Sequence, residues 1–218
     1  QFLALIARAN VTMIAPSRSV QENLARLDAR FRGVSFVTIP HGYGRELKMG
    51  DVQRPPANER LRILVLGQLS VPKGLELLRG SLDALLQFAE IYLVGCRELG
   101  EFFKFKAGVH IFPDYDINEL PGHVATINPH VGLLMSIVPE TFSYALTELM
   151  MLGVPVAATR VGSFPERIQH GQDGFLYEPN VASLLAAMRA INDDRQSLES
   201  IRRNLRGWTP RTAEAMVA

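Results

Sequence analysis

The sequence predicts an α/β fold, a doubly wound parallel sheet of the Rossmann-like kind, preceded by a remnant βαβ piece. From Arg62 onward, short apolar runs alternate strictly with longer helical patterns, and this rotation is typical of a parallel sheet with helices on both faces. Several runs are apolar throughout rather than at alternate positions, which indicates strands that are covered on both faces. Ligands of such sheets bind outside the carboxyl ends of the strands, so the loops that follow strands are the candidate sites.

Residues 1–45 form a smaller unit of the same kind. We expect a strand at Val11–Pro16, Ser17 as the N-cap of an amphipathic helix at Ser19–Phe31, and a second strand at Val34–Pro40. One βαβ unit cannot bury both faces of its sheet, so we interpret it as the remnant of a larger domain. The chain also opens within a helical pattern and without Met, which favours a fragment.

The main domain is predicted at residues 61–208, between a linker at 46–60 and a C-terminal helix at 209–218. The linker is polar and contains a Pro-Pro pair, both typical of a connection between domains. The expected strands of the main domain are Arg62–Gly67, Glu90–Gly95, Val109–Pro113, Val131–Ser136, Val154–Thr159 and Gly174–Tyr177. The expected helices are Leu75–Phe88, Ile117–Ile127, Phe142–Leu152 and Val181–Ile191.

The composition restricts the classes of function. The chain has 218 residues, of which 47% are hydrophobic, and carries 23 Lys and Arg against 22 Asp and Glu. A net charge of +1 gives no general attraction to nucleic acid or to an anionic membrane, so any bound anion must be held by a local site. The single cysteine, Cys96, excludes an internal disulfide, and no apolar run approaches the roughly 20 residues that span a bilayer. We therefore expect a cytoplasmic protein that binds no nucleic acid.

A first candidate site is the turn after the first strand of the main domain, Gly67–Gly74, which contains Gln68 and Lys73. A glycine-bounded turn between a strand and a helix lets backbone N–H groups approach an anion at the helix N-terminus. Lys73 adds a full positive charge for a phosphate. The alternative is an ordinary βα loop with a solvated lysine, and the turn alone does not separate the two.

A second candidate site follows the strand at Val131–Ser136. We expect Thr141 to be the N-cap of the next helix, which leaves the N–H groups of its first turn free to bind an anion. Glu140 lies just before this helix and Glu148 two turns into it. Carboxylates accept strong hydrogen bonds, so hydroxyls of a sugar and a ribose are suitable partners. The alternative is that Glu140 caps the helix and Glu148 lies on its surface, although the stretch around Glu148 is mostly apolar.

A third candidate is the turn after the strand at Val154–Thr159. Gly162 in this turn permits a close approach of the backbone. The alternative is a plain turn in which Pro165 opens a short helix.

Together these motifs resemble the C-terminal domain of the family 4 glycosyltransferases, which have two Rossmann-like domains in the GT-B arrangement. The resemblance covers the Gly-x5-Lys-Gly turn at Gly67–Gly74, the two glutamates with seven residues between them, and the segments MMLGVPVAAT, GSFPERI and HGQDGFLYEP. It extends to Ile39–Gly42, which resembles the end of the family's N-terminal domain, and thus includes nearly the whole chain. The stretches PETFSYALTE and GSFPERI are similar to bacterial enzymes that build surface polysaccharides.

The resemblance implies a role for each matching residue. Lys73 would hold the donor diphosphate, Glu140 would be the active-site carboxylate that positions the donor sugar, and Glu148 would bind the nucleotide ribose. Where the family usually has Arg after the first glycine of the turn, this chain has Gln68, which brings no charge and weakens the grip on the diphosphate. The loop Asp114–Asp116 is expected to contact the nucleobase, with Tyr115 packing there or, as the alternative, in the core. The remaining expected donor-site positions are Gly67, Gly74, Thr141, Phe142, Ser143, Tyr144 and Gly162.

The implied reaction transfers a sugar from a nucleotide diphosphate donor to an acceptor hydroxyl with retention of the anomeric configuration, helped by stabilisation of the leaving diphosphate. A saccharide or lipid-linked saccharide acceptor would bind to the absent part of the N-terminal domain. The fragment would therefore bind donor without transferring sugar, and its exposed edge would favour self-association. We expect the full-length protein in the cytoplasm, including the inner face of the membrane. No cofactor and no metal are expected, because the five histidines show no ligand spacing.

Two other functions use the same residues. One is an inactive nucleotide-sugar-binding module within a larger protein, which Gln68 favours and the presence of Lys73 and both glutamates opposes. The other is a nucleotide-sugar epimerase on the same fold, although such enzymes lack this spacing of glutamates. The donor base, the sugar, the acceptor and the linkage stay open.

Overall fold

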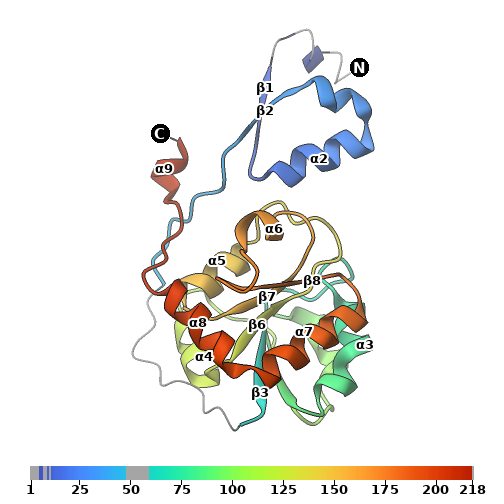
Figure 1. The fold of residues 1–218 in the computed structure, drawn as a ribbon, viewed down its shortest axis with the longest axis vertical. Helices are drawn as coiled ribbons and strands as arrows, with labels where there is room; N and C mark the ends of the chain where they lie inside the picture. The colour runs from blue at the N-terminus through green and yellow to red at the C-terminus, as the bar shows by residue number, and fades with distance from the viewer. Residues whose placement is uncertain (1–4, 7–8, 10, 48–58, 218) are drawn as a thin grey trace.

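The computed structural model describes residues 5–6, 9, 11–47 and 59–217, and it confirms the α/β fold that the sequence predicts (Figure 1). In the described part of the chain, a six-stranded sheet has the order β5-β4-β3-β6-β7-β8, and each neighbouring pair is parallel. The first of these strands in the chain, β3, lies in the middle, so the chain winds outward to one edge and then to the other. The strands are β3 Leu61–Leu66, β4 Ala89–Val94, β5 Val109–Phe112, β6 Val131–Leu134, β7 Val156–Thr159 and β8 Phe175–Tyr177.

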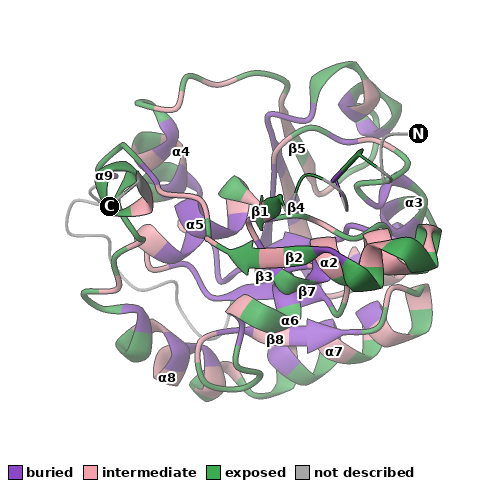
Figure 2. Ribbon diagram, turned by 90° about the horizontal axis from the view of Figure 1, so that it is seen from above, coloured by how far each residue is buried: buried purple, intermediate pink, exposed green. Residues whose placement is uncertain are grey.

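Helices cover both faces of this sheet. One buried cluster joins the sheet to α3 and α7, and another joins it to α4, α5 and α6, while α8 contributes to both. Figure 2 shows the buried strands between helices whose outer sides are exposed. The helices are α3 Leu75–Leu85, α4 Leu120–Ile127, α5 Tyr144–Met151, α6 Phe164–Arg167, α7 Val181–Asp193, α8 Arg195–Leu205 and α9 Ala213–Val217.

Strand β3 shows why the apolar runs are continuous. Ile63 and Val65 enter the cluster with α3 and α7, whereas Leu64 and Leu66 enter the cluster with α4 and α5. All four side chains are 5% exposed or less. Since successive side chains of a strand point to opposite faces, both faces of the sheet are covered, as predicted from the sequence.

Helix α8 was missed by the sequence interpretation. Asp194 separates it from α7, and its carboxylate accepts hydrogen bonds from the backbone N–H groups of Gln196 and Ser197. The stretch is polar overall, and only a narrow apolar stripe, Leu198, Ile201 and Leu205, is buried. One residue thus ends one helix and begins the next, in a stretch where the sequence analysis assigned no element.

Other boundaries differ by a few residues. The helix expected from Ile117 begins at Leu120, where Pro121 occupies its first turn. The helix expected at Leu75–Phe88 ends at Leu85. A 3-10 segment, η2 (Arg97–Phe103), follows β4 where no element was expected.

Near the N-terminus, β1 (Thr12–Ala15) and β2 (Ser35–Thr38) pair in parallel as a separate two-stranded sheet, with α2 (Arg18–Leu27) between them. The prediction of a single helix that continues to Phe31 is wrong. Asp28 adopts an extended backbone conformation and accepts a hydrogen bond from the N–H of Arg30, so α2 ends and a 3-10 turn, η1 (Ala29–Gly33), begins.

The start of α2 also differs from the prediction. Ser17 precedes the helix, but its hydroxyl pairs with that of Ser19 at 2.8 Å and makes no cap hydrogen bond. The carboxylate of Glu166 instead accepts from the N–H groups of Arg18 and Ser19, at 2.9 and 2.8 Å. The main domain therefore caps a helix of the N-terminal piece.

The boundaries of the domains stay a prediction. Residues 48–58, most of the expected linker, lie outside the described residues. In the described ranges, no helix combines the length and the apolar character needed to cross a membrane.

Candidate functional site

The site lies where the winding of the sheet reverses. β3 pairs with β4 on one side and with β6 on the other, so the loops that leave β3 and β6 diverge toward helices on opposite faces. Ligands of doubly wound sheets bind in the crevice at this point. The first two candidate loops of the sequence analysis, Gly67–Gly74 and the segment that precedes α5, are thus brought together.

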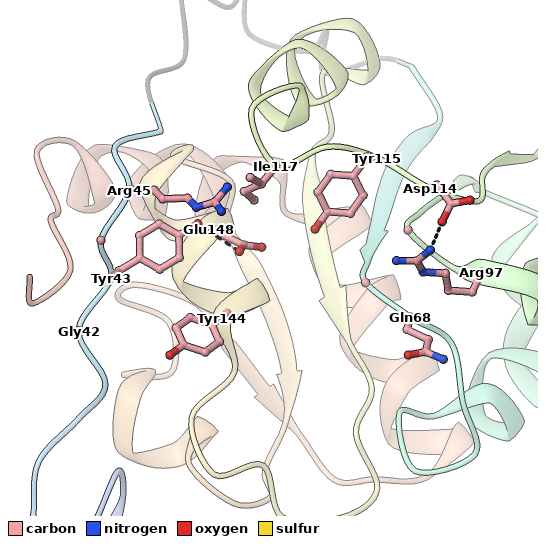
Figure 3. A pocket seen from close by; sticks show the side chains of 13 residues that line it. Gly42, Tyr43, Arg45, Gln68, Arg97, Asp114, Tyr115, Ile117, Tyr144 and Glu148 are labelled. Carbon is pink, nitrogen blue, oxygen red and sulfur yellow. Dashed lines mark hydrogen bonds and ion pairs between the residues drawn. The ribbon is translucent and has the colours of Figure 1, made fainter. Parts of the chain in front are cut away.

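An open cavity of about 690 Å³ lies beside these loops (Figure 3). Gly67 and Gln68 line one part of it, and Tyr144 and Glu148 of α5 line another. Two walls come from elsewhere in the chain. They are the loop after β5, with Asp114, Tyr115 and Ile117, and the segment 42–45.

Glu148 is buried on α5, with 8% of the residue exposed. The hydroxyl of Tyr43 donates a hydrogen bond to its Oε1 at 3.2 Å. Burial raises the pKa of Glu148 above its usual value, while the Tyr43 hydrogen bond and the charge of Arg45 lower it. The alternative of a surface glutamate is therefore excluded, and a buried carboxylate borders the cavity.

A second cavity of about 200 Å³ shares Gly67 and Gln68 with the first. It is also lined by Lys73 and Glu140. These two side chains form an ion pair in which Glu140 is 13% exposed and Lys73 is 48% exposed, and Ser136 donates a hydrogen bond to the same oxygen of Glu140. Lys73 is thus half exposed and pairs with a carboxylate that lines the same cavity.

The three glycines of the motifs have different surroundings. Gly67 has φ +100°, and a Cβ added there would meet no atom within 4 Å, so a ligand can approach its backbone closely. At Gly74 a Cβ would lie 2.2 Å from the carbonyl oxygen of Met135. At Gly162 it would lie 2.2 Å from the backbone nitrogen of Glu140. Gly74 and Gly162 line neither cavity; they let neighbouring loops pack against each other.

The predicted N-cap of α5 is wrong. Thr141 is exposed, and the helix begins at Tyr144 after Ser143, whose hydroxyl accepts a hydrogen bond from the N–H of Leu146 at 3.3 Å. Ser143 has φ +68°, a conformation that is strained for a residue other than glycine. The N–H groups of the first turn are therefore those of Tyr144, Ala145 and Leu146.

Arg167 holds the loop that precedes α5. Its guanidinium donates to the carbonyl oxygens of Phe142 and Ser143 and to the hydroxyl of Thr147. It also lies 4.1 Å from the centroid of the Phe142 ring. Phe142 is 6% exposed, so its side chain anchors the loop in the protein and lines neither cavity.

Tyr115 satisfies both interpretations of the loop after β5. It lines the large cavity and also packs against the second buried cluster. A Cβ added to Gly95 would lie 2.6 Å from its ring, so the glycine makes room for it. Burial raises the pKa of Tyr115 to about 12.

The sequence interpretation missed Tyr43, Arg45 and Arg97 as lining residues. Arg97 follows β4 with φ +57° and pairs with Asp114. Tyr43 follows the Ile-Pro-His-Gly motif, but nothing in the local sequence indicates that its hydroxyl reaches a glutamate 105 residues away. Within the described ranges, no group of three or more His, Cys, Asp or Glu side chains is arranged to hold a metal ion.

The sequence matches known families of enzymes. The family described as glycosyl transferases group 1 matches residues 60–194. The sulfoquinovosyl transferase SQD2 of Arabidopsis thaliana is 30% identical over 150 residues, which are 66% of this chain and 29% of that protein. The N-acetyl-alpha-D-glucosaminyl L-malate synthase of Bacillus anthracis is 54% identical over 39 residues, 18% of this chain and 10% of that protein. The chain thus spans less than a third of the length of either curated relative.

Solved structures share the fold. The sucrose-phosphate synthase of Thermosynechococcus elongatus superposes with a TM-score of 0.73 at 20% identity, over 94% of this chain and 55% of that chain. Anabaena Alr3699/HepE, solved in complex with UDP and glucose, gives a TM-score of 0.73 at 21% identity, over 93% of this chain and 60% of that chain. At these identities the likeness concerns the fold, which is the GT-B fold in its Rossmann-like half.

Proposed function

Because residues 60–194 match it, the chain belongs to the glycosyl transferases group 1 family, and we propose that it is the donor-binding half of a retaining glycosyltransferase. The resemblance to family 4 enzymes that the motifs predict is confirmed. In the full-length protein, this half would present a nucleotide diphosphate sugar to an acceptor hydroxyl. We place the step in the synthesis of a bacterial surface polysaccharide, in the cytoplasm or at the inner face of the membrane.

The observation that carries the proposal is the meeting of the two motif loops at the reversal point of the sheet. The large cavity takes the nucleoside, with Glu148 accepting hydrogen bonds from ribose hydroxyls. The diphosphate lies against the open backbone at Gly67 and near the N-terminus of α5, where the helix dipole favours negative charge. Structures of Anabaena Alr3699/HepE with UDP and with UDP-glucose support a nucleotide-sugar ligand for this fold.

Lys73 and Glu140 supply the chemistry at the reacting end. Charge develops on the leaving diphosphate, and Lys73 stabilises it. Glu140 forms an ion pair with Lys73, so it lies beside the bond to the leaving diphosphate and positions the donor sugar. The acceptor and the remaining wall of the active site belong to residues upstream of this donor-binding half.

An inactive binding module is the second candidate. Gln68 lines both cavities where the family usually has a cation, and the Lys73–Glu140 ion pair leaves Lys73 partly neutralised. Either feature lowers the positive charge available to a diphosphate.

The test is an assay of the full-length protein. Calorimetry with UDP, GDP, dTDP and ADP sugars would identify the donor, and NMR of the product would report the anomeric configuration. Transfer with retention supports the proposal, and donor binding without transfer by the full-length protein supports the inactive module. No binding to any of the four classes contradicts both.

A further inference from the structure

One wall of the large cavity comes from outside the main domain. The segment Gly42–Arg45 follows the two-stranded sheet and runs beside α5 (Figure 3). Tyr43 in this segment is 8% exposed, and its hydroxyl hydrogen bonds to Oε1 of Glu148. Glu148, to which we assign the ribose, is thus hydrogen bonded by a side chain from another part of the chain.

The position of Tyr43 is set by its backbone. Its N–H donates to the carbonyl oxygen of Arg211 at 2.8 Å, and Tyr43 forms a parallel bridge with Thr212. A Cβ added to Gly42 would lie 2.3 Å from the carbonyl oxygen of Thr212, so the two segments touch along their backbones. The C-terminal segment therefore holds Tyr43 in place against Glu148.

We propose that Tyr43 is a positioning residue of the donor site, which holds the Glu148 carboxylate in the orientation that accepts the ribose hydroxyls. The proposal rests on the donor-binding function given above. The Tyr43 hydroxyl occupies Oε1 of Glu148 and leaves Oε2 for a ribose hydroxyl. Without the hydrogen bond from Tyr43, the Glu148 carboxylate is free to rotate about its last side-chain torsion, and its oxygens are no longer held in one orientation.

Because Glu148 is titratable, its surroundings make nucleotide binding depend on pH in a way that tests the role of Tyr43. The titratable or charged groups that face it are Tyr43, Arg45 and Tyr115, with Tyr144 in the same cavity. Burial raises the pKa of both Tyr43 and Tyr115 above their ordinary value of 10.0, which itself lies well above pH 7, so both phenols are protonated and Tyr43 is the donor. Burial also raises the pKa of Glu148, and the Tyr43 hydrogen bond opposes this rise. Loss of the hydroxyl raises the Glu148 pKa further.

Tyr43→Phe tests the inference, because it removes the hydroxyl and keeps the ring. Calorimetry would use whichever of UDP, GDP, dTDP and ADP the wild-type chain binds, between about pH 5 and pH 8. We expect binding at neutral pH to weaken by about 3- to 10-fold, the loss of one hydrogen bond. The acidic limb of the binding curve should move to higher pH, while the affinity for inorganic pyrophosphate stays unchanged.

The matched control is Tyr92→Phe. Tyr92 donates to the carboxylate of Glu90 at 2.9 Å and lines neither cavity. Tyr92→Phe removes an equivalent tyrosine–glutamate hydrogen bond. Its nucleotide affinity and its pH profile should equal those of the wild type. Gly42→Ala displaces the segment that carries Tyr43, so it should weaken binding of the nucleotide at least as much as Tyr43→Phe does.

The outcomes separate this inference from the proposed function. If the wild type binds a nucleotide and Tyr43→Phe binds it with the same affinity and pH profile, the role of Tyr43 is overturned and the donor site stays intact. A wild-type chain that binds none of the four nucleotides would overturn the donor site together with the inference. Equal weakening of nucleotide and pyrophosphate in Tyr43→Phe would also overturn it, because the defect would then not be at the ribose.

Discussion

Replacement of Arg167 by methionine should destabilise the chain through the loop that begins α5. The guanidinium donates to two carbonyl oxygens, those of Phe142 and Ser143, and to the hydroxyl of Thr147. Three hydrogen bonds contribute roughly 1 kcal/mol each, and the contact with the Phe142 ring adds about 0.5–1 kcal/mol. Methionine keeps part of the packing, so we expect a loss of about 2–4 kcal/mol in the free energy of unfolding.

Urea denaturation followed by circular dichroism would measure this loss. The matched control is Arg160→Met, because Arg160 pairs with Glu178 at 3.2 Å with both side chains about half exposed. An exposed pair of this kind contributes less than about 1 kcal/mol. If Arg167→Met cost no more than Arg160→Met, the view that Arg167 fixes the loop would be wrong. Nucleotide affinity should fall in Arg167→Met and not in the control, since only the former releases the strained Ser143.

Three further predictions concern the donor site. Lys73→Ala should weaken binding of a nucleoside diphosphate by about 1.5–3 kcal/mol, the range for a hydrogen bond to a charged group, and leave binding of the free nucleoside unaffected. Calorimetry with both ligands checks this prediction, and equal losses of affinity for the two would contradict the assignment of Lys73 to the diphosphate. Gln68→Arg should tighten diphosphate binding, because it adds a cation beside both cavities; a neutral or harmful effect would mean that the loop cannot present the charge. Burial raises the pKa of Glu148 above its ordinary value of 4.5, so this group stabilises the folded wild type below about pH 4.5, and that stabilisation is lost as pH rises through the folded pKa. Glu148→Gln should abolish this decline while losing nucleoside binding, and urea denaturation at several pH values would show whether the decline persists.

The sequence predicted the sheet and the two main loops because these depend on local patterns. Continuous apolar runs and the glycine-bounded turn at Gly67 mark strands and their ends without reference to the rest of the chain. The apolar neighbours of Glu148 in the same helix also favoured a buried position over the surface position that the sequence left open. These features need only residues that are close together in sequence.

The features that were missed depend on contacts between distant segments. Thr141 is a suitable cap by residue type, but the cap is Ser143, whose carbonyl oxygen accepts a hydrogen bond from Arg167, 24 residues away. Gly162 marks a close approach, as expected, yet the approaching group is the backbone at Glu140. Tyr43 has no local signal at all, since its role depends on a partner 105 residues away.

The seating of segment 42–45 against the C-terminal segment has a consequence for the order in which the protein folds. Gly42 and its partner Met216 are 174 residues apart in the chain, so this contact closes a very long loop, and contacts of high sequence separation are typical of slow folding. During synthesis, segment 42–45 is made before its partner segment and can dock against it only once residues 211–216 have been made. The six-stranded sheet, with the loops that follow β3 and β6, includes none of these residues. The wall of the large cavity that contains Tyr43 can therefore be completed only after synthesis has passed Thr212.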